Sequence, residues 1–221
     1  MTKYEGSPLL IATNNPGKIK ELYELLDDTG IELVTPAQIN LFLDVIEDGL
    51  TYAENATKKA IAFAKQSGLI SLADDSGLEV DALNGEPGLY SARYGSNSVL
   101  PPSSASPQMG EVREGRLSDK GRREFLIKNL QAKPRPWTAR FHATIAVAIP
   151  NGNIHLAEGW CEGQIIPEER GTGGFGYDPI FLLPELGRTM AELTMEEKNR
   201  LSHRARAVMN AKQILDSLFS K

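Results

Sequence analysis

Residues 74–77, Asp-Asp-Ser-Gly, place two carboxylates and a hydroxyl directly after the apolar run 69–73. Carboxylate and hydroxyl oxygens are hard ligands that suit Mg²⁺, which proteins usually hold with one or two carboxylates and substrate phosphates. A second strand-like run follows at once, so Gly77 is the expected bend between two strands. If the strand is regular here, Asp74 and Asp75 point to opposite faces. Taken alone, the motif fits a polar turn better than a metal site. The choice between the two therefore depends on other stretches of the sequence.

Residues 13–18, Thr-Asn-Asn-Pro-Gly-Lys, connect a buried-strand pattern at residues 8–12 to apolar residues at helical spacing. Asn15 is a suitable N-cap, and Pro16 suits the first helical position. The free N–H groups and the positive dipole end of such a helix bind phosphate, and Lys18 adds a cation there. The spacing is not that of a P-loop. A plain capped helix with a solvated lysine is an equal alternative.

The connection before the next helix carries Glu47. A capping-box pattern at residues 51–54 predicts a helix that ends at Gly68, and Lys59 lies within it. Glu47 is placed where a third carboxylate could meet the aspartate pair, although the spacing alone does not require it.

The glycine-rich segment 171–179 formally matches G-x-G-x-x-G. No strand leads directly into it and no helix follows, so a dinucleotide site is excluded. Closely spaced glycines let backbone approach a ligand, and Phe175 offers a flat face on which a base could stack. An ordinary buried loop aromatic is a comparable alternative.

A second capping box at residues 194–197 starts a helix that carries Lys198, and Ser202 is the expected N-cap of the C-terminal helix. His203 and Arg204 then lie in its first turn, where the helix dipole disfavours cations. An anionic or carbonyl-rich ligand at that end would explain the pair. The alternative is a solvated basic face.

The elements that must position these residues alternate between strands and helices. Strands are predicted at residues 8–12, 31–34, 69–73 and 78–83, and as a long antiparallel hairpin of residues 139–149 and 154–166. Helices are predicted from residue 16, from 51 to 68, from 118 to before 134, and in the C-terminal tail after 202.

Four side chains of the predicted hairpin are expected to pack rather than to bind a metal. The hairpin carries two isolated histidines, His142 and His155, and its return strand carries Trp160 and Cys161. No partner spacing around either histidine indicates a metal site, so the sequence predicts that all four side chains are packed against the core.

The composition is that of an ordinary soluble globular protein, with 221 residues, 41% hydrophobic and 24% charged. A net charge of −5 and the absence of a basic stripe make a nucleic-acid polymer an unlikely partner. One cysteine, no signal-peptide pattern and no apolar run long enough to cross a bilayer predict a cytoplasmic protein with no membrane contact.

Taken in order, these stretches resemble the inosine triphosphate pyrophosphatase family, hydrolases of non-standard purine nucleoside triphosphates. The matching segments are residues 12–18, Glu47 with 51–56, 73–78, 87–94, 171–179 and 198–204. Residues 96–117 are longer and richer in Ser and Pro than the family pattern. They predict a loop insertion within a single domain that spans residues 1–221.

The resemblance implies an α/β fold with an elongated mixed β-sheet, flanking helices and two lobes around a central cleft. It also implies Mg²⁺-dependent hydrolysis of ITP, dITP or XTP to the nucleoside monophosphate and pyrophosphate, by a homodimer. Asp75 would be the proton acceptor and a metal ligand, Glu47 a second metal ligand and Asp74 a supporting catalytic residue. Beside Mg²⁺, Asp75 is expected to keep a low pKa.

The same resemblance assigns the nucleotide contacts by position. These residues are Thr13, Asn14, Asn15, Pro16, Gly17, Lys18, Lys59, Ser76, Phe175, Gly176, Tyr177, Asp178, Lys198, His203 and Arg204.

Three other functions remain open from the sequence. One is a pyrophosphatase of related fold that acts on standard or pyrimidine nucleotides. Another is a phosphatase that releases orthophosphate stepwise. The third is a nucleotide-binding regulator without catalysis, which would have no need of carboxylates that position a metal and a water.

Overall fold

The computed structural model describes residue 4, residues 6–96 and residues 117–219. These form a seven-stranded sheet with the order β2-β1-β3-β4-β5-β6-β7. The strands are β1 (Leu9–Ile11), β2 (Leu33–Val34), β3 (Ile70–Val80), β4 (Trp137–Ala148), β5 (Ile154–Ile165), β6 (Phe181–Leu183) and β7 (Arg188–Thr189). The α-helices are α1 (Pro16–Leu26), α2 (Tyr52–Ser67), α3 (Asp119–Leu130), α4 (Met195–Leu201) and α5 (His203–Phe219).

The sheet is mixed, which confirms the predicted α/β class. β1 pairs in parallel with β2 and β3, whereas β3, β4, β5, β6 and β7 pair antiparallel in that order. Within the parallel pair, Ile11 lies beside Leu72. The chain that leaves β1 therefore runs next to Asp74 and Asp75, so the phosphate-binding motif and the acidic motif meet at the C-terminal end of β1, beside the middle of β3.

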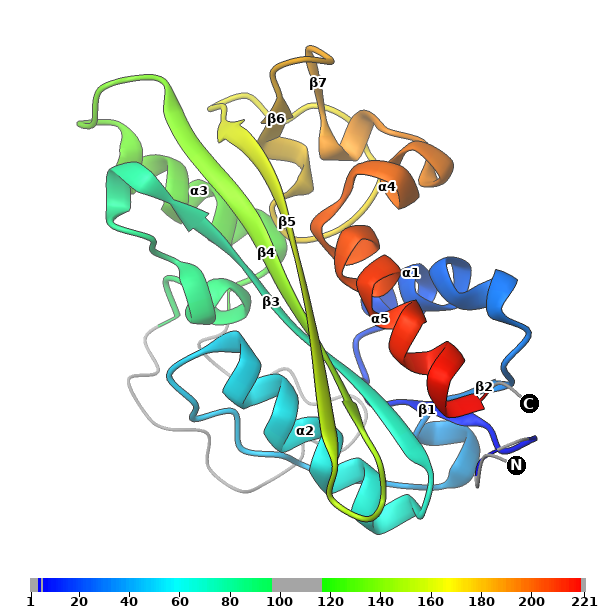
Figure 1. The fold of residues 1–221 in the computed structure, drawn as a ribbon. Coiled ribbons are helices and arrows are strands. Elements are labelled where there is room, and N and C mark those ends of the chain that lie inside the picture. Colours follow the sequence, from blue (N-terminus) through cyan, green and yellow to red (C-terminus); the bar gives the residue numbers. More distant parts are fainter. Residues whose placement is uncertain (1–3, 5, 97–116, 220–221) are drawn as a thin grey trace.

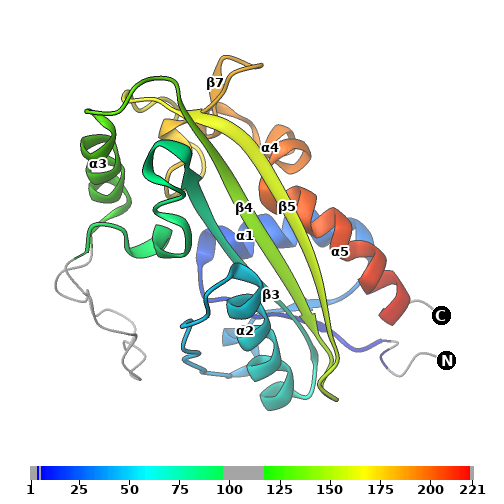
Figure 2. The same ribbon diagram turned by 60° about the vertical axis from the view of Figure 1, so that its left-hand side comes forward.

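Helices cover both faces of this sheet (Figures 1 and 2). On one face, α1 and α5 pack through Leu22, Leu26 and Val208 against alternate side chains of the central strands. On the other face, Ala56, Ala60 and Phe63 of α2 pack against the opposite set. α3 closes the far end together with β6, where a third apolar cluster forms.

The predicted helix starts are largely confirmed. Asn15 caps α1 by accepting hydrogen bonds from the N–H groups of Gly17 and Lys18, and Pro16 is the first helical residue. The capping box at residues 194–197 is complete. In α2, Thr51 accepts from Glu54 as predicted, but the Glu54 carboxylate accepts from the Leu50 N–H instead, so only half of that box forms.

Gly77 is not a bend, and that prediction is wrong. β3 runs unbroken from Ile70 to Val80. A Cβ at Gly77 would lie 2.3 Å from the Gly88 carbonyl oxygen and 2.6 Å from the Tyr52 hydroxyl. The glycine therefore permits the close approach of a neighbouring segment. Because the strand is regular, Asp74 and Asp75 face opposite sides of the sheet.

The long hairpin of β4 and β5 forms as predicted, and Cys161 is buried in it. The expected packing of Trp160 and His155 is wrong, because Trp160 is 41% exposed and His155 is also exposed. Every second side chain of β5 packs against α5, whereas many of the side chains between them, on the other side of the strand, are exposed.

The loop insertion predicted at 96–117 lies almost wholly outside the described residues. None of the described helices is long and apolar enough to cross a membrane.

Candidate active site

The predicted site residues surround a cavity of about 580 Å³ between the turn that follows β1 and the middle of β3. All of them except Asn14 and Asp74 line it. The lining residues from the prediction are Thr13, Asn15, Pro16, Gly17, Lys18, Glu47, Lys59, Asp75, Ser76, Phe175, Gly176, Tyr177, Asp178, Lys198, His203 and Arg204.

The start of α1 provides one wall of the cavity. Asn15 holds the first turn, and the Thr13 hydroxyl accepts a hydrogen bond from the Asn15 N–H at 3.2 Å. Lys18 reaches across to β3, with Nζ 3.3 Å from an Asp74 carboxylate oxygen and 3.2 Å from the Asp74 carbonyl oxygen. Burial lowers the pKa of Lys18, although Asp74 opposes this shift. The predicted phosphate-binding turn and the acidic motif are thus in direct contact.

Asp74 belongs to a buried ionic network on the α1 and α5 side of the sheet. Its carboxylate, which is fully buried, accepts from Arg204 Nε at 2.8 Å. Arg204 also pairs with Glu21 and donates to the Ser76 hydroxyl at 3.0 Å. Although burial acts in the opposite direction, Arg204 and Lys18 hold the pKa of Asp74 well below its usual range. Asp74 is therefore a fixed anion that orients two cations.

Lys198 extends this network from α4 to the glycine-rich loop. Its ammonium lies 2.6 Å from Glu21 and 2.7 Å from Asp178. The same Asp178 oxygen accepts the Phe175 N–H at 3.0 Å. Although burial acts in the opposite direction, these two carboxylates raise the pKa of Lys198 above its usual value. Lys198 is therefore a buried cation that anchors the loop.

Phe175 projects from that loop toward the start of α1. The Lys198 ammonium and the Arg204 guanidinium carbon lie 5.5 Å and 5.7 Å from the centre of its ring. A Cβ at Gly17 would lie 2.7 Å from a ring carbon of Phe175. The aromatic ring thus adjoins both the phosphate-binding turn and the basic end of α5.

His203 begins α5, after Ser202, whose hydroxyl accepts from the Ala205 N–H as predicted for an N-cap. The imidazole is buried and stacks on Phe141, with ring centres 4.8 Å apart. Burial, together with the charge of Arg204, lowers the pKa of His203 well below its usual value, so the ring is neutral. A solvated basic face, the alternative for this segment, is wrong because His203 and Arg204 are both buried.

Asp75 faces the α2 side, opposite to Asp74. There Lys59 lies 2.6 Å from a Glu47 oxygen and donates to the Asp74 carbonyl oxygen at 3.3 Å. Burial raises the pKa of Asp75, against the opposing effect of Lys59 and Lys18, and the like charges of Glu47 and Asp74 add to the increase. The low pKa expected for Asp75 beside Mg²⁺ is a property of the metal-bound site, which this direction does not test.

The donors at this position fit a hard divalent cation that shares its coordination with a substrate. No group of three or more His, Cys, Asp or Glu side chains within the described residues could hold a metal alone. Asp75 and Glu47 instead supply two carboxylates in one cavity, the number that Mg²⁺ commonly takes from a protein when phosphates provide the rest. A cation beside them would also lower the pKa of Asp75, which burial and, to a smaller extent, the neighbouring carboxylates raise.

Sequence reasoning missed four charged residues at the site. Arg93, Asp119 and Arg122 line the cavity, and Glu21 pairs with two of the cations behind it. Arg93 lies in the segment 87–94 that carries the resemblance, so it could have been found. Glu21 lies one turn after Lys18 on the same helix, which was a weaker signal. Nothing in the sequence places Asp119 or Arg122 near the glycine-rich loop.

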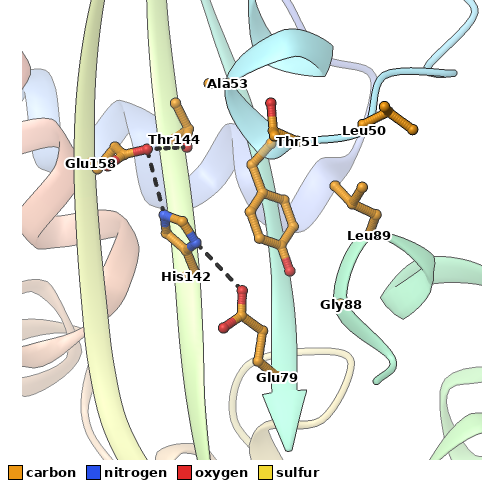
Figure 3. A pocket seen from close by; sticks show the side chains of 10 residues that line it. Leu50, Thr51, Ala53, Glu79, Gly88, Leu89, His142, Thr144 and Glu158 are labelled. Atoms are coloured by element: carbon orange, nitrogen blue, oxygen red, sulfur yellow. Dashed lines mark hydrogen bonds and ion pairs between the residues drawn. The ribbon is translucent and has the colours of Figure 1, made fainter. Parts of the chain in front are cut away.

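A second cavity, of about 450 Å³, lies beyond the start of α2 and contains none of the predicted site residues (Figure 3). His142 lies there between Glu79 and Glu158, with ring nitrogens 3.5 Å and 3.7 Å from their carboxylates. Its ring stacks on Trp160 and meets the Tyr52 ring edge-on. The packing role predicted for His142 is confirmed.

Comparison with known proteins gives a family assignment. The model of the Ham1 family matches residues 9–214. A dITP/XTP pyrophosphatase from Desulforamulus reducens is 48% identical, over 96% of each chain. One from Thermus thermophilus is 45% identical, over 92% of this chain and 89% of the relative. The structure of a HAM1 protein from Coxiella burnetii is similar, with a TM-score of 0.79, 36% identity, and coverage of 95% of this chain and 98% of that chain. This chain therefore belongs to the Ham1 family.

Proposed function

We propose that this protein hydrolyses the non-standard purine nucleoside triphosphates dITP, ITP and XTP to the monophosphate and pyrophosphate, which removes them from the nucleotide pool. The observation that carries the proposal is the meeting of the α1 turn and Lys18 with Asp75 and Glu47 around one cavity. Relatives 48% and 45% identical that bear the name dITP/XTP pyrophosphatase support it.

The triphosphate binds at the start of α1 in this proposal. The free N–H groups of the first turn and the positive end of the helix dipole favour an anion. Lys18, Lys59 and Arg93 line the same space and supply positive charge. Arg93 extends the set of phosphate contacts that the family resemblance implied.

Mg²⁺ is the cofactor that the donor set fits best, with Asp75 and Glu47 as the residues that would hold it. When bound, the cation neutralises charge that develops on the phosphoryl oxygens. Lys59 lies beside Glu47 and holds this carboxylate toward the cavity.

Asp75 accepts the proton of the attacking water in the proposed reaction. Asp75 lines the cavity, and a carboxylate within hydrogen-bond reach of the attacking water can act as its general base. Asp74 is excluded from this role because Arg204 and Lys18 take up its charge on the other face of the sheet. Its contribution is to position those two cations.

The purine is held at the other end of the cavity by Phe175, Lys198, His203 and Arg204. Phe175 stacks on the base. Neutral His203 carries one N–H group, and the residue lines the cavity. A ring N–H here can donate to the 6-keto oxygen of hypoxanthine or xanthine. The 6-amino group of adenine would leave that donor unpaired, which disfavours ATP.

One product-resolved assay separates the proposal from its alternatives. With dITP and Mg²⁺, we expect pyrophosphate and dIMP in equal amounts, and loss of turnover when the metal is chelated. Orthophosphate as the first product would indicate a stepwise phosphatase. Equal turnover of GTP or dTTP would indicate the related pyrophosphatase of standard nucleotides, and binding without turnover would indicate a regulator.

Three properties that the sequence and its family resemblance imply stay predictions. These are the homodimer, the cytoplasmic location and the single domain spanning residues 1–221.

A further inference from the structure

Two side chains of α3 hold the peptide groups that follow Phe175. The Asp119 carboxylate accepts the Gly176 N–H at 2.7 Å, and Arg123 donates to the Gly176 carbonyl oxygen at 2.8 Å. We refer to Asp119 and Arg123 as the α3 clamp. Both hydrogen bonds join residues more than fifty positions apart in the chain, so they connect the glycine-rich loop to a separate helix.

The α3 clamp is itself held firmly. Arg123 is buried and makes a bidentate contact with Glu169, with both N···O distances at 2.9 Å. Asp119 pairs with Arg122, which donates to the Leu117 carbonyl oxygen at 2.8 Å. Each of the two groups that contact Gly176 therefore also has an ionic partner of its own.

Phe175 needs such support because glycines flank it. Gly174 and Gly176 have φ angles of +73° and +62°, and glycine gives the chain its greatest conformational freedom. On one side, Asp178 accepts the Phe175 N–H at 3.0 Å. On the other side, only the α3 clamp among the described side chains bonds to the Gly176 backbone. The direction of the Phe175 side chain is thus fixed from both ends.

We propose that Asp119 and Arg123 are positioning residues for purine recognition, which hold Phe175 in the orientation that stacks on the base. The inference rests on the proposed role of Phe175. Neither member of the α3 clamp takes part in phosphoryl chemistry, which occurs at the other end of the cavity beside Asp75.

Asp119→Ala separates base recognition from phosphate binding. We expect the KM for dITP to rise about tenfold, a part of what base stacking on an aromatic ring contributes. The kcat should stay within about threefold, because the reacting phosphates are held elsewhere. The Ki of inorganic tripolyphosphate, a competitor that has no base, should not change. A merely structural defect would shift both KM and Ki and would lower the melting temperature.

Three further variants make the test decisive. Glu124→Ala removes an exposed carboxylate from the same helix, which pairs with Lys120, and should leave KM unchanged. Asp119→Asn keeps an oxygen that can accept the Gly176 N–H and should recover most of the affinity. If Asp119 acts through Phe175, then Asp119→Ala should have no further effect on KM in a Phe175→Ala background.

The outcomes distinguish the inference from the proposed function. An unchanged KM in Phe175→Ala would overturn the stacking role. A raised KM in Phe175→Ala with a normal KM in Asp119→Ala would overturn the α3 clamp alone. Additive effects in the double variant, or an equal rise in the Ki of tripolyphosphate, would also contradict the clamp.

Discussion

At the scale of single residues, the two adjacent aspartates have different surroundings because a regular strand turns them to opposite faces. Asp74 has its charge compensated by Lys18 and Arg204. Asp75 is buried on the other face, which raises its pKa, and the charges of Lys59 and Lys18 only partly offset this increase. An anion paired directly with two cations stabilises the fold, whereas one without a direct ion pair among the described residues is available for a metal and a proton. The difference assigns chemistry to Asp75 and support to Asp74.

Asp75→Asn should lower kcat for dITP by about 10²–10⁴-fold, the usual contribution of a positioned base. Nucleotide affinity should stay within about tenfold, roughly 1.4 kcal/mol, because the cations and α1 are untouched. Steady-state kinetics and equilibrium binding of dITP measure both. Asp81→Asn is a matched control near the end of the same strand, where Asp81 pairs with Arg140 away from the cavity. Near-normal kcat in Asp75→Asn would disprove the assigned role.

At the scale of elements, β3 joins both halves of the site because it is continuous. The strand carries Asp75 and Ser76 at the cavity. At the next residue, Gly77, the segment 88–93 crosses the strand at close range. Ser91 fixes this crossing, since its hydroxyl accepts the Leu78 N–H at 2.8 Å and donates to the Gly88 carbonyl oxygen at 2.6 Å. Arg93 is brought to the cavity by this contact.

Gly77→Ala should destabilise the protein by about 1–3 kcal/mol, which corresponds to about 2–12 °C in melting temperature. The added methyl would lie 2.3 Å from backbone, which cannot move aside as a side chain can. Thermal unfolding monitored by circular dichroism measures the shift. Gly121→Ala adds the same methyl to α3, where the nearest contact is 3.3 Å, and should be neutral or stabilising. Equal melting temperatures for the two variants would refute the close-approach explanation.

At the scale of the whole molecule, one buried ionic network joins four elements. Glu21 of α1 pairs with Lys198 of α4 and Arg204 of α5, and Arg204 pairs with Asp74 of β3. The elements lie far apart in the sequence, and each contributes residues to the cavity or to its support. Fold stability and site geometry are therefore coupled through Glu21.

Glu21→Ala should lower the free energy of unfolding by about 3–5 kcal/mol, because it leaves two buried cations without one partner. Denaturant unfolding of the variant measures this loss. Glu24→Ala changes the same residue type one turn later at an exposed position and should stay within about 0.5 kcal/mol of the parent. A loss of less than about 1 kcal/mol in Glu21→Ala would show that the network does not hold these elements together.

The sequence alone predicted most of the elements, although it missed β6 and β7 and divided β3 into two strands. Alternating apolar patterns gave the β4–β5 hairpin, and the caps at Asn15 and Ser202 gave the starts of α1 and α5. These signals succeed because they depend on neighbours a few residues apart. Sixteen of the residues named from the ordered motifs line the cavity, whereas Arg93, Asp119 and Arg122 of its wall were not named.

The tertiary structure decided what no local pattern contains. In the folded chain, Gly77 is not a bend but the point where another segment approaches β3 closely, and Trp160 is exposed. The surroundings lower the pKa of Asp74 and raise that of Asp75. The tertiary structure also brought Glu21, Asp119 and Arg123 to the site. Burial and charge pairing depend on segments that meet only when the chain is folded. The sequence therefore determined which groups are present, and the fold determined which of them are charged, paired and able to react.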